Sequence, residues 1–220
     1  MNIQLLSKFE LFKGMSLEEI ELMCKCLTID KKTYKKGEII LHNGDTITSV
    51  ALVSVGQVSL EFYDILGNKN IINVIPQYGM FAESYAALPG FELGVTVTAS
   101  ENCEILFVDI TNIISLCDYR CSYHTRLIAN LLGSLAKKNI ALSKKIAITM
   151  DKSIRDRVVS FLTYEKNAHG SNDFMISLNR QEMADYLRVD RSALSKELGK
   201  MKKDGLIEFH KNHFIIKDFN

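Results

Sequence analysis

The sequence predicts an α+β protein with an N-terminal antiparallel β-roll or jelly-roll barrel, one long helix, and a C-terminal region of short helices closed by a hairpin. Short apolar segments separated by glycines fill residues 33–109, and apolar residues at helical spacing follow from residue 118 without any proline. Of the 220 residues, 47% are hydrophobic, which is enough for a substantial core. We expect three regions, at residues 1–115, 116–148 and 149–220.

The first region is expected to begin with a short helix and to continue as strands. Ser16 followed by Glu19 is a capping-box pattern, which predicts a helix over residues 16–26. Seven of the 12 glycines lie in residues 33–109, and several of the apolar segments between them alternate with period two. Short strands joined by such turns indicate an antiparallel barrel or sandwich. The predicted strands are residues 38–41, 50–55, 58–63, 71–75, 95–99 and 105–108.

Residues 118–147 predict one long helix, because apolar residues recur every three to four positions. Asp118 is placed to cap its start. About 30 residues at 1.5 Å each give a rod of about 45 Å, longer than most globular helices. A second copy of the same helix is the natural packing partner, so we expect a homodimer; the alternative is a helix packed only on its own barrel. The residues expected at the dimer interface are Ile128, Leu131, Leu132, Leu135 and Leu142.

The last region predicts a helix–turn–helix followed by a wing. A helix over 152–167 and a short strand over 174–176 precede two helical patterns, 180–187 and 191–203, joined by three residues. Met183 and Leu187 share one face of the first helix, and Leu194 and Leu198 share one face of the second. Strands over 206–209 and 214–216 then form a hairpin. This order of elements is typical of winged DNA-binding units.

The outward face of the second helix favours DNA binding over a purely structural helix pair. Arg191 and its polar neighbours lie near the N-terminal end, which a recognition helix directs at base edges. Arginine can donate two hydrogen bonds to guanine, and lysine or serine can contact bases or phosphates. Ser177 or Asn179 can cap the first helix, whose N-terminal amides would then face a phosphate. The candidate DNA-binding residues are Arg180, Gln181, Arg191, Ser192, Ser195 and Lys196.

Taken together, the barrel, long helix and winged helix–turn–helix resemble the Crp/Fnr family of bacterial transcription regulators over nearly the whole chain. The segment NRQEMADYLRVDRSALSKELGKMKKDGLI is similar to the family's DNA-binding unit almost position for position. The resemblance implies a homodimer that binds a near-palindromic site in double-stranded DNA, with RNA polymerase as a partner if the output is activation. It places Arg191, Ser192 and Lys196 at base or nearby backbone contacts. Arg188 stands where many such units have glycine in the turn.

The segment GMFAESYAALPGFELGVTVTASENCEILFVD resembles the family's effector site, in which a Gly-Glu pair, a short helix and an Arg-Ser pair hold a cyclic nucleotide. Here Glu83 is retained, but Leu93 and Gly94 replace the Arg-Ser pair. No Arg or Lys lies between Gln77 and Asp109. A buried phosphate without a cation is poorly compensated, so we expect that cyclic AMP is not the effector. A different small molecule, a redox signal or no ligand at all remain open.

The resemblance also places part of the long helix at the effector site. Lys138 and Asn139 stand where the cyclic-AMP receptors contact the base with Thr and Ser. The nearby side chains Leu88 and Phe91 would make the pocket more apolar than a nucleotide needs. Glu83 has a second interpretation as a cap for a short helix over residues 84–88. The candidate effector-pocket residues are Phe81, Glu83, Ser84, Tyr85, Leu93, Lys138 and Asn139.

Other classes of function are disfavoured. The sequence has no catalytic motif, so we expect no enzyme activity, and it indicates no metal site and no particular cofactor. Cys117, Cys121 and His124 have a spacing suited to a metal or redox cluster, but small buried residues at a domain junction are the favoured interpretation.

The odd count of five cysteines, the absence of a signal peptide and the lack of any apolar run near 18 residues predict a cytoplasmic protein. The alternative function is a cyclic-nucleotide-binding regulatory module that acts through a protein partner.

Charge is distributed unevenly along the chain although the net charge is only +1. Residues 1–110 carry 8 basic and 14 acidic side chains, residues 111–150 carry 6 and 1, and residues 151–220 carry 13 and 11. An acidic N-terminal half joined to a basic C-terminal half indicates an anionic partner for the C-terminal half.

Overall fold

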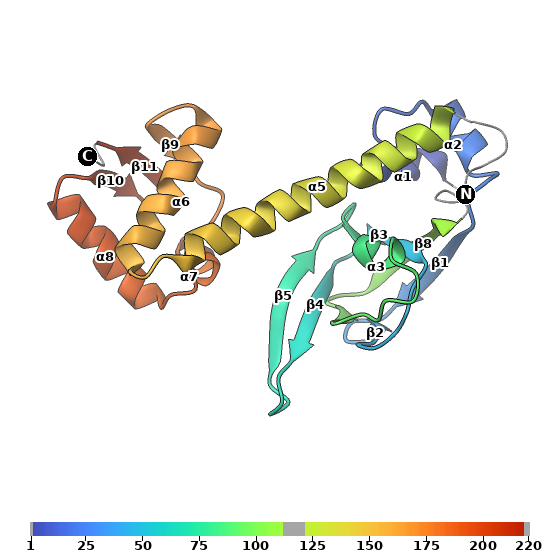
Figure 1. Cartoon of the computed structure of the whole chain (residues 1–220), viewed down its shortest axis with the longest axis horizontal. Helices are drawn as coiled ribbons and strands as arrows, with labels where there is room; N and C mark the ends of the chain where they lie inside the picture. Colours follow the sequence, from blue (N-terminus) through green and yellow to red (C-terminus); the bar gives the residue numbers. More distant parts are fainter. Residues whose placement is uncertain (1, 112–121, 218–220) are drawn as a thin grey trace. The chain divides into compact units, whose positions relative to one another are not determined.

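The computed structural model describes residues 2–111 and 122–217, and it divides into two compact units, Met1–Lys137 and Lys138–Asn220. The first unit contains two antiparallel sheets and short helices, and the second contains helices with a three-stranded sheet (Figure 1). The predicted α+β class is therefore confirmed. None of the helices within these described ranges has the length and apolar character that crossing a bilayer requires.

The chain enters the first unit through three short helical segments: α1 (Ile3–Leu6), the 3-10 turn η1 (Glu10–Phe12) and α2 (Leu17–Met23). The predicted capping box starts α2. The Ser16 hydroxyl accepts from the amide of Glu19, and the Glu19 carboxylate accepts from the Ser16 amide at 2.7 Å. The sequence did not predict α1 and η1, because segments of three or four residues are too short to show helical periodicity.

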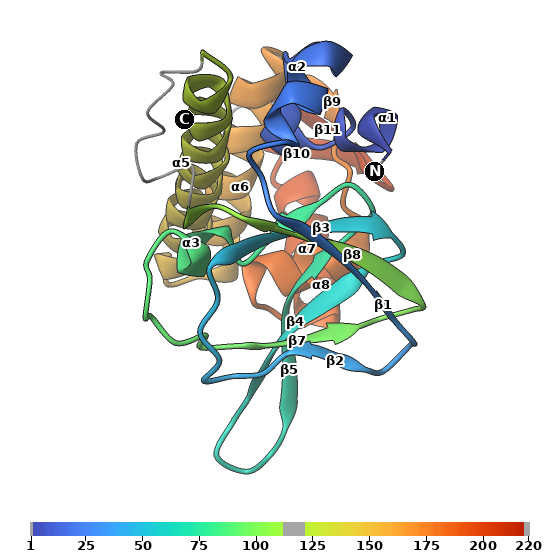
Figure 2. The ribbon, with the colours of Figure 1, turned by 90° about the vertical axis from the view of Figure 1, so that its right-hand side faces the viewer.

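Two four-stranded antiparallel sheets form the body of the first unit, and Figure 2 shows them as separate layers. All six predicted strands are present. Two more, β1 and β6, were not predicted; β1 consists mostly of exposed polar residues, and β6 has only two residues. One sheet is β1 (Ile29–Tyr34), β8 (Cys103–Asp109), β3 (Ser49–Val55) and β6 (Met80–Phe81); the other is β2 (Ile39–Leu41), β7 (Thr96–Ala99), β4 (Val58–Tyr63) and β5 (Lys69–Ile75).

The sheet that contains β3 is covered by apolar side chains on both faces. Successive side chains of a strand point to opposite sides, so alternate residues of β3 enter different clusters. Ala51 and Val53 belong to the apolar cluster that also contains Val58 and Val97 of the other sheet. Val50 and Leu52 belong to a second cluster, with the N-terminal helices and the first turns of α5. A small helix, α3 (Glu83–Ala86), follows β6.

Helix α5 (Ser122–Met150) is the predicted long helix, and its expected cap, Asp118, lies outside the described residues. Leu127 and Leu131 are buried in the cluster shared with the N-terminal helices. The expectation that Leu131 faces a second subunit does not fit this burial, since its side chain is only 5% exposed. Leu132 and Leu142, in contrast, are exposed.

In the second unit, α6 (Ile154–His169) begins at the capping residue Ser153 and ends at Gly170, whose φ of 65° is left-handed. A three-stranded sheet contains β9 (Asp173–Met175), β10 (Ile207–His210) and β11 (His213–Ile216), with β11 in the centre. Helices α7 (Arg180–Leu187) and α8 (Arg191–Lys203) have the predicted bounds. One apolar cluster joins all of these elements.

Candidate nucleic-acid interface

Helix α7 is fixed at both ends by local hydrogen bonds. The Asn179 side chain accepts from the amides of Gln181 at 2.9 Å and Glu182 at 3.0 Å, and the Glu182 carboxylate accepts from the Asn179 amide at 2.7 Å. Asn179, and not Ser177, is therefore the cap. At the other end Arg188 has φ 54° and ψ 52°, the left-handed conformation expected of a turn position that many related units give to glycine. Both ends of α7 are thus determined by residues close by in the sequence.

Helix α8 separates an apolar face from a polar one. Leu194, Leu198 and Met201 are fully buried against the other helices and the wing strands. The candidate base-contacting residues lie toward the N-terminal end of α8 and are exposed. The exposed candidates on α8 are Arg191, Ser192, Ser195 and Lys196.

Arg180, one of the candidate DNA-binding residues, contacts the wing of its own unit. Its guanidinium donates to the backbone carbonyl of Lys211 at 3.0 Å and lies over the rings of Phe209 and Phe214, 5.3 and 5.6 Å from their centroids. Burial lowers the pKa of this guanidinium. We therefore interpret Arg180 as a brace between α7 and the wing. Gln181 remains exposed and donates to Asp185 at 2.8 Å along the same helix.

Two arginines of α6 that sequence reasoning missed hold the helix–turn–helix in place. Arg155 donates to Glu197 at 2.6 Å and to Asp204 at 2.7 Å, which ties α6 to α8. Arg157 donates to the carbonyls of Leu187 at 3.2 Å and Arg188 at 3.3 Å, in the turn itself. No sequence signal marks these arginines, because their partners lie roughly 30 to 50 positions further along the chain.

The wing is a tight hairpin, with His210 paired opposite His213 and Lys211 in the turn at φ 52°. His213 contacts the Asp173 carboxylate at 2.5 Å, which adds a side-chain contact between β11 and β9. The ammonium of Lys202, on α8, lies 5.7 Å from the centre of the Phe209 ring. These contacts connect the wing to β9 and to the C-terminal end of α8.

The comparisons with known proteins agree with this geometry. The family model of a Crp-like helix-turn-helix domain matches residues 156–220, and that of a cyclic nucleotide-binding domain matches residues 31–120. The chain belongs to the Crp/Fnr family of transcription regulators. The expectation drawn from the sequence resemblance is therefore confirmed, and the C-terminal unit is the DNA-binding part of such a regulator.

Similar proteins span most of the chain at low identity. Electron transport regulator A of Shewanella oneidensis is 25% identical over 199 residues, which cover 86% of this chain and 75% of the relative. Transcriptional activator protein FnrL of Cereibacter sphaeroides is 21% identical over 205 residues, which cover 86% and 77%. The structure of CprK complexed with OCPA matches with a TM-score of 0.62 at 15% identity, covering 90% of this chain and 89% of that one. The last likeness shows the fold alone.

The candidate effector residues of the barrel are largely buried. Phe81 and Leu93 are each 1% exposed, and Glu83 is 3% exposed at the start of α3. Tyr85 is half-buried, and its hydroxyl accepts from the amide of Gly94 at 3.3 Å. Ser84 is exposed.

One expectation about this site needs correction. Leu88 and Phe91, expected to make the pocket apolar, are more than half exposed, so they do not form an enclosed lining. Lys138 and Asn139 lie on α5 at the start of the second unit, and their place in the effector pocket stays a prediction. Ala82, which stands in the place of the family's glycine, adopts φ 62°, a conformation that glycine takes without strain.

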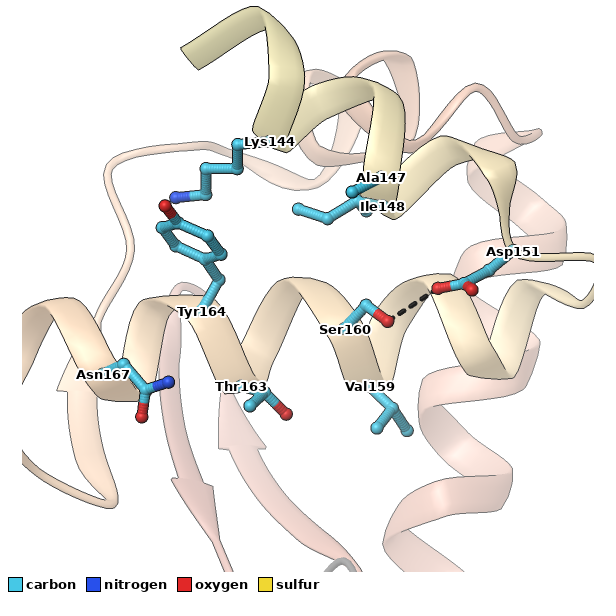
Figure 3. Close-up of a pocket in the computed structure, with 9 residues that line it drawn as sticks. All are labelled: Lys144, Ala147, Ile148, Asp151, Val159, Ser160, Thr163, Tyr164 and Asn167. Atoms are coloured by element: carbon cyan, nitrogen blue, oxygen red, sulfur yellow. Dashed lines mark hydrogen bonds between the residues drawn. The ribbon is translucent and has the colours of Figure 1, made fainter. Parts of the chain in front are cut away.

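A surface pocket of about 330 Å³ lies instead in the second unit, between the end of α5 and α6 (Figure 3). None of the candidate effector residues lines it. The Ser160 hydroxyl donates to Asp151 at 2.6 Å, and the ammonium of Lys144 lies 3.3 Å from the centre of the Tyr164 ring.

The first unit also holds a buried carboxylate that sequence reasoning missed. Glu61 on β4 is fully buried, pairs with Lys69 at 2.6 Å, and accepts hydrogen bonds from Ser59, Tyr63 and Thr98. Burial alone would raise the pKa of this carboxyl, but Lys69 and the three hydroxyls together lower it below its ordinary value. The network is confined to β4, β5 and β7, and we interpret it as structural.

The cysteine and histidine candidates give no metal centre within the parts of the chain that the structure describes, where no three His, Cys, Asp or Glu side chains form a group that could hold a metal ion. Cys117 and Cys121 lie outside the described residues. His124 is buried, and its Nδ1 atom has no hydrogen-bond partner.

Proposed function

We propose that this Crp/Fnr regulator binds a near-palindromic DNA site as a homodimer, with Arg191 as its main base-contacting residue. The observation that carries the proposal is the exposed N-terminal end of α8, where a guanidinium, an ammonium and two hydroxyls lie on the face opposite the buried leucines. Arginine can donate two hydrogen bonds to guanine O6 and N7 in the major groove. Recognition helices of this class approach base edges with their N-terminal residues.

The remaining contacts would position the unit on the DNA backbone. The N-terminal amides of α7 and the side chain of Gln181 are placed to face a phosphate, and Lys211 at the wing turn carries a further cation. Arg155 and Arg157 keep α8 and the turn in a fixed geometry before DNA arrives. Such preorganisation reduces the ordering cost of binding.

A dimer is needed because a single unit of this size makes few base contacts. Two units related by a twofold axis would bind half-sites about 34–36 Å apart, one turn of DNA. If the regulator activates transcription, RNA polymerase is the further partner.

The test is the Arg191→Ala variant, with Lys202→Ala as the matched control. Arg191→Ala should weaken specific binding by about 1–3 kcal/mol and relax the preference at one guanine in each half-site. Lys202→Ala should weaken binding to specific DNA and to random DNA by similar factors, and both factors should be smaller than the loss of specific binding caused by Arg191→Ala. Affinities are measured by fluorescence anisotropy on operator and random duplexes at fixed salt. Equal losses for Arg191→Ala on both duplexes would make it a phosphate contact and contradict the assignment.

We further propose that cyclic AMP is not the effector. The region between Gln77 and Asp109 contains no cation, and the position of the family's phosphate-binding arginine is the buried Leu93. Losing a charge-assisted hydrogen bond costs about 1.5–3 kcal/mol, or about one to two decades of affinity. The effector, if there is one, is then another small molecule or a redox signal.

Isothermal titration of the purified protein with cyclic AMP and cyclic GMP tests this proposal directly. Neither nucleotide should bind at micromolar concentration. Micromolar binding that also raises operator affinity would overturn the proposal. A Lys138→Ala variant would then show whether that lysine supplies the missing cation.

A further inference from the structure

Helix α8 begins differently from the two longer-capped helices of its unit, α6 and α7. The Ser153 hydroxyl accepts from the amide of Asp156 at 3.0 Å at the start of α6, and the Asn179 side chain accepts from two amides of α7. At α8 the capping position is occupied by Asp190, whose carboxylate accepts no such hydrogen bond. Aspartate is among the residues that most often cap a helix, so the carboxylate of Asp190 is not used here in its usual way.

The backbone that carries this carboxylate is nevertheless held in place. The Asp190 carbonyl accepts from the amide of Leu194 at 2.9 Å, which is the first hydrogen bond of α8. The preceding turn is held by Arg157, which donates to two of its carbonyls. Asp190 therefore stands at a defined place on the unit, directly before Arg191.

The carboxylate of Asp190 lies among basic side chains. It is the only acidic group in residues 188–196, which also contain Arg188, Arg191 and Lys196, and all four of these residues are exposed. Among the described residues, none forms an ion pair with the Asp190 carboxylate. A negative charge at the end of α8 that approaches DNA repels nearby phosphates, so it weakens binding unless a base donates a hydrogen bond to it.

Only some bases can donate that hydrogen bond. In the major groove the amino groups of cytosine and adenine are donors, whereas guanine and the carbonyl of thymine only accept. Adenine also presents the acceptor N7 beside its amino group, which disfavours a second carboxylate oxygen, so cytosine is the best partner for a carboxylate.

The position of that cytosine follows from the position of Arg191. Successive Cα atoms are about 3.8 Å apart, and successive base pairs are about 3.4 Å apart along the DNA axis. Neighbouring residues at the start of α8 can therefore contact neighbouring base pairs.

We propose that Asp190 is a specificity-determining residue, whose carboxylate accepts a hydrogen bond from the amino group of a cytosine on the base pair next to the guanine contacted by Arg191. On DNA that lacks this cytosine the same carboxylate is repulsive. The inference rests on the DNA recognition proposed above. Specificity is a difference between two affinities, and a repulsive group that only the cognate site can satisfy increases that difference.

The first test is the Asp190→Asn variant of the full chain, because asparagine has the same size and caps helices equally well. Its affinity for a random duplex should rise by about two- to fivefold, since an exposed charge near the phosphates is removed. Its affinity for the operator should not rise. The matched control is Asp156→Asn, which removes the same charge from an exposed residue of α6 and should change both affinities by equal factors. Equal changes on the two duplexes for Asp190→Asn would overturn the inference.

The second test is selection of bound duplexes from a library that is randomised across the half-site. The wild-type protein should select a cytosine on the base pair next to the guanine whose preference Arg191→Ala relaxes. Asp190→Asn should admit adenine at the cytosine position, because an amide both accepts from and donates to adenine, and should retain the guanine.

The selection separates failure of this inference from failure of the proposed function. An unchanged cytosine preference in Asp190→Asn, or the absence of any cytosine preference beside the guanine in the wild-type protein, would overturn the inference and leave recognition by Arg191 intact. A wild-type protein that selects no sequence, or an Arg191→Ala variant that selects the same guanine as strongly, would instead refute the proposed function.

Discussion

The DNA-binding unit and the barrel present their candidate residues in opposite ways. In the DNA-binding unit, four candidates lie exposed on a single helix, and Leu194 between them is buried. In the barrel, the corresponding residues come from β6, α3 and the loop before β7, and three of them are almost fully buried. A surface on one helix is encoded by helical spacing, whereas a pocket depends on which side chains the fold leaves accessible and which it buries. The predictions below therefore compare how much folding stability or DNA binding is lost when single residues of each region are replaced.

The largest effect is expected in the core beneath the recognition helix. Leu198→Ala removes a fully buried side chain and should destabilise the C-terminal unit by about 2–5 kcal/mol, because the lost burial and the remaining cavity both contribute. DNA binding should fall with the folded fraction. Hydrogen exchange of residues 152–217 measures the local stability directly.

Lys196→Ala is the control on the exposed face of the same helix. It should weaken DNA binding while leaving hydrogen exchange unchanged. If Leu198→Ala and Lys196→Ala altered exchange equally, the separation into a buried and a DNA-facing side would be wrong.

The second effect concerns the buried carboxylate of the barrel. Glu61→Gln should cost about 1.5–3 kcal/mol at neutral pH, because Lys69 and the hydroxyl donors then face a neutral amide. The pKa of Glu61 is lower in the folded state, so its stabilising contribution is present above the ordinary glutamate pKa and is lost as the pH falls through the folded value.

Urea unfolding between neutral and acidic pH tests the sign of this effect. The wild-type barrel should lose stability on acidification, and the Glu61→Gln variant should lose less. A variant with the same pH slope as the wild type would show that Glu61 is not responsible.

The sequence predicted the features that depend on residues close together in the chain. It failed to predict features that depend on contacts between residues far apart in the chain. The capping box at Ser16 and the bounds of α7 and α8 were predicted, because the residues that determine them lie within a few positions of one another. Strand β1 was missed because pairing with β8 places its polar residues in a sheet without any apolar alternation. Arg180 was assigned to DNA because its sequence position is correct, but aromatic rings from the wing, about 30 residues away, engage its guanidinium.

A smaller effect is expected for the wing brace. Arg180→Met keeps an apolar stem over Phe209 and Phe214 but removes the hydrogen bond to the carbonyl of Lys211, which should cost about 1–1.5 kcal/mol. Hydrogen exchange should increase in the wing and remain unchanged in α8. If DNA specificity changed at one base pair while the wing kept its protection, Arg180 would be a base contact after all.

The smallest effect is expected at Ala82. Its left-handed φ of 62° carries a strain of about 1–2 kcal/mol, and glycine would relieve it while adding about 0.5–1 kcal/mol of backbone entropy cost. Ala82→Gly should therefore stabilise the barrel by about 0.5 kcal/mol in thermal unfolding. The control Ala86→Gly, inside α3, should destabilise it by about 1 kcal/mol or more. A destabilising Ala82→Gly would show that the Ala82 methyl group packs usefully.

The arginines of α6 determine where this molecule can be divided for engineering. Transplanting only residues 180–203 into another regulator, to transfer its operator preference, would leave behind Arg155 and Arg157. Glu197 would then lack its arginine, and the carbonyls of Leu187 and Arg188 would lack a donor. The smallest segment that carries its own supports begins at Ser153 and ends after β11, so a functional chimera should be joined before α6.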